Sequence, residues 1–308
     1  MKNKNNIYQP LVSVVVLTYN SSKTVVETLE SIKLQSYKKI ELVITDDSSQ
    51  DSTLNVCKKW CDENSHYFEN VLITKTETNL GVANNCNNGV QKSHGEWIKI
   101  IAGDDLLEET CIESNIVFLS DNPNCRIVFS KNMLFDSETK QCMGIKPSND
   151  YVCPTNVEDQ FIYLLKKDFV IPTTLFIEKK LLYDAGLYNN KYPFMEDYPM
   201  WYRITKKGIR IYYNPIVTVR YRISVSSLSN SARNGAINMR WLSCYNSFFH
   251  DCLKPELLKR KYFFLAYTKQ FDLYVKMKYS STKYNIVFFF FKLIGAITGR
   301  FYDYLVKA

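Results

Sequence analysis

The sequence predicts an α/β protein in which a Rossmann-like, mostly parallel sheet is flanked by helices and followed by a helical C-terminal tail. Over the first hundred residues, apolar β-branched runs alternate with segments of helical periodicity. Polar clusters stand where these runs end, and the last quarter of the chain keeps a helical period and carries a different charge. Alternating strands and helices build parallel sheets with right-handed crossovers, so these patterns indicate this fold class.

The alternation begins with residues 11–17, which are almost uninterruptedly apolar and β-branched, as in a strand buried on both faces of a parallel sheet. A helix should follow, because Val25, Leu29 and Ile32 share one helical face. The same reasoning predicts strands at 40–44, 71–74 and 97–101 and helices at 51–63 and 83–92.

Periodicity is weaker in the second half of the chain. It predicts helices at 106–119 and 195–206, and strands at 126–130, 170–177 and 216–222. Beyond Ser231 the period is helical to the end, and Pro255 should open one of these helices. We therefore expect one domain at residues 1–231, divided near residue 110, and a separate tail at residues 232–308.

Positive charge is concentrated in this tail. The net formal charge is +8, yet residues 1–232 carry 26 Lys and Arg against 27 Asp and Glu, whereas residues 233–308 carry 13 against 4. The tail also holds 19 of the 44 aromatic residues. Its longest apolar stretch, residues 286–298, is interrupted by Lys292 and is shorter than the ~20 residues of a spanning helix. Basic residues interleaved with aromatic ones predict helices lying on an anionic membrane surface.

A nucleic-acid-binding tail on a non-catalytic scaffold is the alternative interpretation, because the same charge would attract phosphates. The aromatic residues cluster with aliphatic ones in helical runs, which favours a bilayer interface, and no nucleic acid is expected as a partner. Nine cysteines without a Cys-x-x-Cys pair, and only three histidines, argue against zinc and for reduced thiols. Residues 1–10 lack the apolar core of a signal peptide. We expect a cytoplasmic protein, peripheral on the membrane.

Three polar clusters follow predicted strands and should meet at one edge of the sheet. They are Thr18-Tyr19-Asn20 after the first strand, Asp46-Asp47-Ser48-Ser49 after the second, and Gly103-Asp104-Asp105 after the fourth. Each cluster alone could be a turn with a capping Asp. Ligands of open α/β sheets bind beyond the carboxyl ends of the strands, so the shared position of the clusters predicts a binding site.

The acidic side chains of these clusters suggest a metal and a nucleotide. Adjacent carboxylates behind a glycine suit Mg²⁺ or Mn²⁺, hard cations that bridge to phosphate oxygens, so Asp104 and Asp105 are the expected metal ligands at a diphosphate. Asp46 could accept a hydrogen bond from a base such as uracil, while Tyr19 could stack on that base.

Two further groups lie nearer the C-terminus. Glu196 or Asp197 could act as general base on an acceptor hydroxyl. Alternatively, both acids could simply occupy a helix N-terminus, where the helix dipole favours negative charge. The sequence favours neither interpretation over the other. Arg220 and Arg222 alternate on a predicted strand, so both guanidiniums could reach one anionic group.

Taken together, these motifs resemble the family 2 glycosyltransferases, which have the GT-A fold and build bacterial capsule, O-antigen or exopolysaccharide. The resemblance runs from about Pro10 to about Ser229 and rests on signals that occur in order. They are Val14 to Asn20, Glu41 to Thr53, Asn79-Leu80-Gly81, Asn87-Asn88-Gly89 with Gly95-Glu96-Trp97, Gly103-Asp104-Asp105, and Glu196-Asp197-Tyr198 with Trp201.

The resemblance implies a nucleotide-sugar-binding half at about 10–110 and an acceptor half at about 111–231. It implies a UDP-linked donor and a single displacement with inversion in which Asp197 is the base. Together with the membrane-binding tail, it leads to the hypothesis that the acceptor is a lipid-linked saccharide at the inner membrane. The residues expected to contact the nucleotide sugar are Thr18, Tyr19, Asn20, Asp46, Asp47, Asn79, Gly81, Asn87, Gly103, Asp104, Asp105, Arg220 and Arg222.

The chain departs from the family pattern at three places. Ala102 stands where the metal-binding Asp-x-Asp motif normally has its first Asp, so the metal should depend on Asp104, with Asp105 as a helper. Cys86 replaces a residue that is often basic, and Ser224 replaces the family's histidine. A nucleotidyltransferase is the alternative enzyme class, but the turn at residues 18–23 has no glycine and a single lysine to hold a triphosphate.

Overall fold

A computed structural model of the chain describes residues 8–223 and 238–279. These residues form two compact units, the first comprising residues 8–162 and 169–223, and the second residues 163–168 and 238–279. The boundary that the sequence predicts near residue 231 lies outside the described residues.

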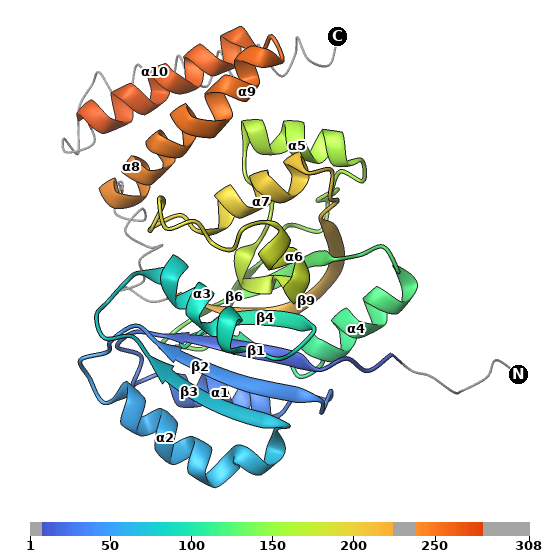
Figure 1. The fold of residues 1–308 in the computed structure, drawn as a ribbon, viewed down its shortest axis with the longest axis vertical. Coiled ribbons are helices and arrows are strands. Elements are labelled where there is room, and N and C mark those ends of the chain that lie inside the picture. The colour runs from blue at the N-terminus through green and yellow to red at the C-terminus, as the bar shows by residue number, and fades with distance from the viewer. Residues whose placement is uncertain (1–7, 224–237, 280–308) are drawn as a thin grey trace, which may run out of the picture. The chain divides into compact units, whose positions relative to one another are not determined.

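The first unit is built on a single sheet, and nine strands of the described residues belong to it. Its order is β3-β2-β1-β4-β8-β6-β9-β5, with β7 paired to β6. The run from β3 to β4 can be followed in Figure 1. The first four strands in the chain are mutually parallel, whereas β8 runs antiparallel to β4 and to β6. The strands are β1 (Val12–Thr18), β2 (Ile40–Asp46), β3 (Asn70–Lys75), β4 (Trp97–Ala102), β5 (Leu106–Leu107), β6 (Ile127–Asp136), β7 (Cys142–Lys146), β8 (Phe176–Glu178) and β9 (Tyr212–Ile223).

Helices cover both faces of this sheet. Val14 of β1 and Leu42 of β2 pack with Leu29 of α1 and Cys57 of α2 in one apolar core. The opposite face of β1 receives α3, whose Gly89 lies directly over Val15. The helices of this unit are α1 (Val25–Lys33), α2 (Thr53–Asn64), α3 (Val82–Lys92), α4 (Cys111–Asp121), α5 (Val157–Lys166, which continues into the second unit), α6 (Lys179–Asp184) and α7 (Asp197–Lys206), with short helical turns η1 (Ser65–Tyr67) and η2 (Pro172–Thr174).

The predicted α/β fold is confirmed, and the strands and helices of the first hundred residues lie within two residues of their predicted ends. Two later predictions were wrong. Residues 106–107 form β5, which pairs with β9, and the helix begins only at Cys111. The predicted strand at 170–177 is broken by η2, because Pro172 has no N–H to donate to a sheet ladder. Residues 142–146, 157–166 and 179–184 form elements that were not predicted.

The second unit is helical, as predicted for the tail. It contains α8 (Met239–Phe248), the π-helical turn η4 (Phe249–Leu253), α9 (Lys254–Lys259) and α10 (Phe263–Tyr279). Asn238 caps α8 by accepting hydrogen bonds from Arg240 N and Trp241 N, and Pro255 opens α9 as expected. Within residues 8–223 and 238–279, no helix is both long and apolar enough to cross a bilayer. The predicted apolar stretch at 286–298 lies outside the described residues.

Candidate active site

The carboxyl ends of β1 and β2 are joined through Asp46. Its side chain is fully buried. One carboxylate oxygen accepts hydrogen bonds from Thr18 Oγ1 at 2.8 Å and Ser49 Oγ at 2.6 Å, and the other accepts from Ser49 N at 2.8 Å. Both oxygens therefore serve to hold the two turns together, and contact of Asp46 with a nucleotide base stays a prediction.

The turn after β1 presents an aromatic ring to solvent. Asn20 has a positive φ of 52°, and its side-chain oxygen accepts a hydrogen bond from Gln50 N at 2.9 Å, while its own N–H donates to Ser49 Oγ at 2.8 Å. These bonds fix the backbone on either side of the turn, and the neighbouring Tyr19 is half exposed. The ring of Tyr19 is therefore accessible to a planar ligand.

Asp47 connects the same edge to the start of α3. Its two carboxylate oxygens accept hydrogen bonds from Leu80 N and Gly81 N, each at 2.8 Å. Gly81 has a φ of +86°, a conformation that only glycine adopts easily, and it lies against Pro193. This contact brings residues 79–81 and the segment before α7 to the site edge.

The turn after β4 lies against the end of β1. Gly103 N donates to Leu17 O at 2.8 Å, and Gly103 O accepts from Thr24 Oγ1 at 2.8 Å. A Cβ on Gly103 would stand 3.1 Å from Thr18 Cγ2, so glycine permits this close approach. The Gly103-Asp104-Asp105 turn thus lies beside Thr18 and Asp46, as the sequence predicts.

The carboxylates of this turn are only partly used by the protein. Asp105 is buried, with one oxygen accepting from Arg222 N at 2.9 Å and the other left without a hydrogen-bond partner. Burial raises the pKa of Asp104 and Asp105, and the charge of Asp104 raises that of Asp105 further. Positive charge at this point would favour the ionised forms of both groups.

A divalent cation fits this pair of carboxylates. It would neutralise the buried Asp105 and the partly buried Asp104, and it would give the unpartnered oxygen of Asp105 a ligand. Among residues 8–223 and 238–279, no group of three or more His, Cys, Asp and Glu side chains could enclose an ion. Mg²⁺ and Mn²⁺ can complete their shells with water and substrate phosphate oxygens, so two carboxylates are compatible with either ion.

The two arginines of β9 have separate protein partners. Arg220 pairs with Glu108 at 2.9 Å. Arg222, whose side chain is only 3% exposed, donates from Nε to Asp104 O at 2.6 Å and from Nη2 to Glu27 Oε2 at 2.8 Å. The sequence predicts that both guanidiniums reach one anionic group, but in the structure each binds a different carboxylate.

The second carboxylate pair lies where α7 begins. Asp197 Oδ1 accepts a hydrogen bond from Tyr198 N at 2.7 Å. Burial raises the pKa of Asp197, and burial together with the charge of Asp197 raises the pKa of Glu196 to about 8. A carboxyl group with a raised pKa is a stronger base once it is ionised, as a general base requires.

Contacts from α3 position this pair. Asn87 forms two hydrogen bonds with the backbone of Tyr188, each at 2.9 Å, and so holds the loop that leads into α7. Burial raises the pKa of Cys86, and the charges of Glu196 and Asp197 raise it further, so Cys86 faces both carboxylates as a neutral thiol. The predicted site residue Asn87 therefore acts on the loop in this structure.

Sequence reasoning missed several residues that shape the site. Thr24 and Glu27 contact the Gly103–Asp105 turn and its arginine, and Tyr188 holds the loop that leads into α7. Glu27 and Arg222 are 195 residues apart in the chain. Neither periodicity nor a local motif signals a contact over such a separation.

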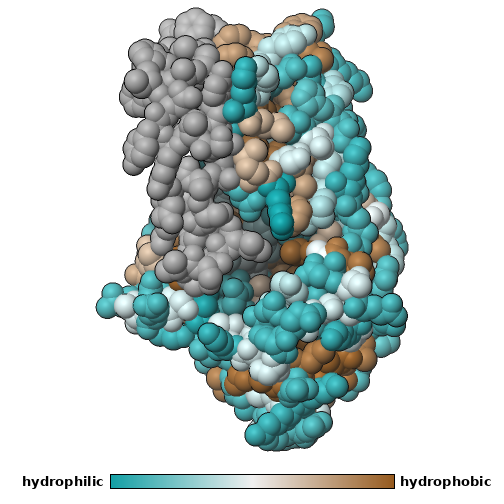
Figure 2. All heavy atoms as spheres, turned by 90° about the vertical axis from the view of Figure 1, so that its left-hand side faces the viewer, coloured by the Kyte–Doolittle hydropathy of each residue, from teal (hydrophilic) through white to brown (hydrophobic). Residues whose placement is uncertain are grey.

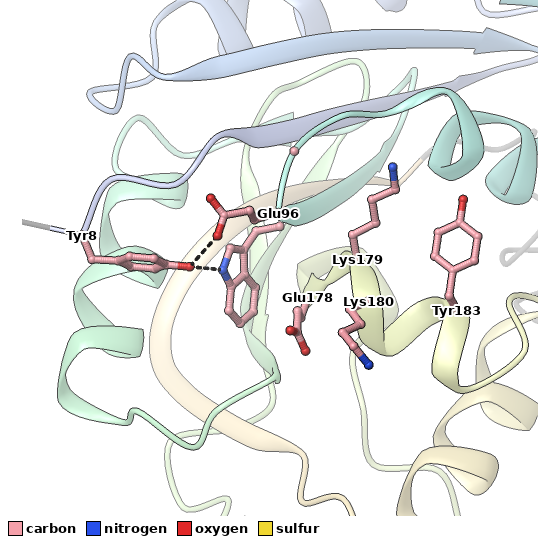
Figure 3. Close-up of a pocket in the computed structure, with 8 residues that line it drawn as sticks. Tyr8, Glu96, Glu178, Lys179, Lys180 and Tyr183 are labelled. Atoms are coloured by element: carbon pink, nitrogen blue, oxygen red, sulfur yellow. Dashed lines mark hydrogen bonds between the residues drawn. The ribbon is translucent and has the colours of Figure 1, made fainter.

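A surface pocket of about 340 Å³ lies at the other end of β4, where Trp97 begins the strand. The hydroxyl of Tyr8 accepts a hydrogen bond from Trp97 Nε1 and donates to Glu96 (Figure 3). Glu178 pairs with Arg126, and Lys180 pairs with Asp184. Since its charged groups are engaged by the protein and it lies at the amino end of the strand, we assign this pocket no part in the site.

Comparisons with known proteins agree on the family. The family model described as "Glycosyl transferase family 2" matches residues 13–184, more than half of the chain. A protein named as an uncharacterized glycosyltransferase in Rickettsia felis is 28% identical over 274 residues, which cover 86% of this chain and 43% of the relative. The chain therefore spans less than half the length of that relative.

The name of a second relative specifies an enzymatic activity. It is the Escherichia coli protein "UDP-Glc:alpha-D-GlcNAc-diphosphoundecaprenol beta-1,3-glucosyltransferase WfaP", which is 27% identical over 221 residues covering 71% of this chain and 80% of the relative.

Solved structures resemble the fold. Residues 1–349 of Staphylococcus aureus TarS in complex with UDP-GlcNAc align with a TM-score of 0.61 at 16% identity, covering 89% of this chain and 76% of that one. The Pyrobaculum calidifontis mannosyltransferase PcManGT, in complex with GDP-Man and Mn²⁺, aligns with a TM-score of 0.60 at 18% identity, covering 94% and 80%. The GT-A fold is thereby confirmed. Because the family model spans most of the sheet and the turns described above, this chain belongs to glycosyltransferase family 2.

Proposed function

We propose that this chain is an inverting, metal-dependent transferase that moves a sugar from a UDP-sugar to a hydroxyl of a lipid-linked saccharide. The observation that carries the proposal is the pair Asp104 and Asp105 at the carboxyl edge of the sheet, in which Asp104 is partly buried and Asp105 is buried with one oxygen that has no partner. Buried charges persist only when they are paired or bind metal.

The donor would lie along the same edge. Tyr19 offers an exposed ring for the base, and the backbone of the Gly103–Asp105 turn approaches β1 closely. Asp104, with Asp105 as helper, would hold Mg²⁺ or Mn²⁺, which supplies positive charge to the leaving diphosphate. Complexes of structural relatives with UDP-GlcNAc, and with GDP-Man and Mn²⁺, support a nucleotide-sugar donor and a divalent metal.

Transfer requires a base for the acceptor. Asp197 takes the proton of an acceptor hydroxyl as its oxygen bonds to the anomeric carbon, and the bond from that carbon to the diphosphate breaks on the opposite side. The nucleoside diphosphate leaves with the electron pair, and the anomeric configuration inverts. Burial raises the pKa of Asp197, and its charge together with burial raises that of Glu196 to about 8, which supports a role in proton transfer at this position.

The acceptor is proposed from the relatives. WfaP bears a name that specifies a diphosphoundecaprenol-linked sugar as acceptor, which supports a lipid-linked saccharide and a role in surface polysaccharide synthesis for this chain. Such an acceptor lies in a membrane, so the enzyme would work as a peripheral protein at the cytoplasmic face.

The helical unit supports membrane contact. Residues 238–279 carry eight Lys and Arg against three Asp and Glu. Exposed aromatic residues recur along α10 at helical spacing, including Tyr267 and Tyr274, which are 57% and 55% exposed. Ammonium groups lie 5.5 Å from each ring, Lys254 at Tyr267 and Lys278 at Tyr274. Hydrophobic residues also reach the described surface elsewhere (Figure 2), and lysines lie over exposed rings there too, as Lys33 does at Tyr67. The feature that supports membrane contact is therefore the recurrence of exposed aromatic residues along one basic helix.

A panel of donors tests the proposal. Purified protein would be incubated with UDP-, GDP-, CDP- and dTDP-sugars, with and without Mn²⁺, and nucleotide release would be measured with a polyprenyl-diphosphate-linked sugar as acceptor. We expect release from a UDP-sugar that depends on both metal and acceptor, and a product of inverted anomeric configuration. Metal-independent transfer or a retained configuration would overturn the mechanism.

A further inference from the structure

Arg222 is engaged by three groups at once. Its backbone N–H donates to Asp105 Oδ1 at 2.9 Å, its Nε donates to Asp104 O at 2.6 Å, and its Nη2 donates to Glu27 Oε2 at 2.8 Å. The guanidinium also lies 4.8 Å from the centre of the Phe135 ring. The guanidinium is planar and always charged, and these contacts leave it little freedom to move.

Glu27 is the outer anchor of this arrangement. It lies in the first turn of α1, where it accepts from Nη2 of Arg222 while Nε of the same guanidinium donates to Asp104 O. It also pairs with Lys140 at 3.0 Å, and its side chain is 45% exposed. Burial would raise the pKa of Glu27, but hydrogen bonds from Arg222 and Lys140 outweigh this and lower it, so Glu27 is ionised at neutral pH.

We propose that Glu27 and Arg222 form a clamp that positions the Gly103–Asp105 turn for metal and diphosphate, so that Arg222 is a positioning residue and not a phosphate ligand. The inference rests on the proposed function and deepens it. The clamp joins helix α1 and strand β9 to the one turn that carries both expected metal ligands. Outer groups that orient metal ligands commonly change metal affinity by 10–100-fold when they are removed.

The clamp and the phosphate-ligand role predict opposite effects of Glu27→Gln. If Arg222 bound the diphosphate directly, losing its ion pair would free the guanidinium, and UDP would bind as well as before or more tightly. If Arg222 acts through the turn, losing Glu27 loosens the turn, and UDP with Mn²⁺ binds more weakly. Because Glu27 is partly exposed and lies outside the core, the variant should fold.

The test is calorimetry of the full-length chain with UDP in the presence of Mn²⁺, and with uridine as a ligand that lacks the diphosphate. We expect Glu27→Gln to raise the Kd of UDP with Mn²⁺ about tenfold and to leave the Kd of uridine unchanged. Glu30→Gln is the matched control: it lies one turn further along α1 and pairs with Lys33, away from the turn. It should bind both ligands like the wild type.

A double-mutant cycle combines Glu27→Gln with Arg222→Lys. Lysine keeps the charge but lacks the rigid pair of Nε and Nη2 donors that bond Asp104 O and Glu27, so Arg222→Lys should weaken UDP binding. Adding Glu27→Gln to this variant should weaken UDP binding little further. Unchanged or tighter UDP binding by Glu27→Gln, or defects that multiply independently, would overturn the clamp. Absence of Mn²⁺-dependent UDP binding by the wild type would instead overturn the proposed function.

Discussion

At the scale of single residues, the site has two carboxylate pairs with different surroundings. Asp104 and Asp105 follow β4 and are oriented by Arg222, whereas Glu196 and Asp197 open α7 beside the neutral thiol of Cys86. Burial raises the pKa of all four groups. A nearby cation would favour ionisation of the first pair, while the second pair keeps the basicity that proton transfer requires.

Asp104→Asn should remove metal-dependent donor binding. The amide has no charge to hold Mg²⁺ or Mn²⁺, and Ala102 supplies no second acid before it. We expect the Kd of UDP with Mn²⁺ to rise more than about tenfold, while binding of UDP without metal stays as in the wild type. Calorimetry with and without EDTA measures this, and unchanged metal dependence would place the metal elsewhere.

The proposed base should give the activity profile an acid limb above the usual range of an aspartate. Asp197 must be ionised to accept a proton, and burial raises its pKa, while burial and the charge of Asp197 raise the pKa of Glu196 to about 8. The value of kcat/KM should therefore rise with pH, with its midpoint above the pKa of about 4 of an exposed aspartate. Glu196→Gln leaves Asp197 buried, so it should keep this limb, and a midpoint near pH 4 would contradict the assignment.

Asp197→Asn separates binding from transfer. It should bind the donor normally but lose transfer by about 10²–10⁴-fold, the usual contribution of a general base. Binding is measured by calorimetry and transfer by nucleotide release. Full transfer by this variant would exclude Asp197 as the base and point to Glu196.

At the scale of elements, helices pack closely on the sheet at positions where a residue without a side chain faces a strand. Gly89 of α3 is the clearest case, since a Cβ there would stand 2.3 Å from Val15 Cγ1 and 3.1 Å from Thr45 Cγ2. Without side-chain bulk at this point, α3 lies flat on β1 and β2 and carries Asn87 and Gly81 to the site edge.

Gly89→Ala should destabilise the fold even though alanine is the better helix former. Overpacking typically costs about 1–3 kcal/mol, and helix propensity returns about 1 kcal/mol, so we expect a net loss of up to about 2 kcal/mol in the free energy of unfolding. Urea denaturation measures it. Gln91→Ala, exposed on the same helix, should change stability by less than about 0.5 kcal/mol. If Gly89→Ala and Gln91→Ala had the same free energy of unfolding, α3 would be able to move away from β1 without destabilising the fold.

Element prediction succeeded where burial and periodicity agree. β1 and β2 are buried along almost their whole length, so an apolar β-branched run identifies them. It failed at residues 106–107, where a short pairing with Val219 and Arg220 of β9 replaces the first turn of a helix. β5 and β9 are more than one hundred residues apart in the sequence. A local sequence pattern therefore does not predict their pairing.

At the scale of the whole molecule, the chain combines a sheet unit with the GT-A fold and a basic helical unit. We predict that the full chain sediments with vesicles of phosphatidylcholine and phosphatidylglycerol but not with pure phosphatidylcholine. Replacing Phe264, Tyr267 and Tyr274 of α10 with serine should reduce the bound fraction at least about fivefold, because interfacial aromatic residues and lysines act together.

Tyr67→Ser/Tyr183→Ser is the matched control for this experiment, because both residues are about half exposed but belong to the sheet unit. It should bind vesicles like the wild type. If the α10 variant still binds fully, the helical face is not the membrane contact. A change in sedimentation coefficient without vesicles would indicate that α10 joins two copies of the chain instead.

The sequence by itself determined the α/β class, the four parallel strands and the convergence of their polar turns, because strand burial and chain order are local properties of the residues. Only the tertiary structure decided what each polar side chain does there. It gives Asp46, Asp47 and Asn87 protein partners, and it ties Arg222 to Glu27 and the Asp104–Asp105 turn. These contacts depend on how segments that are distant in the sequence pack against one another. The spacing of residues along the chain does not encode that packing.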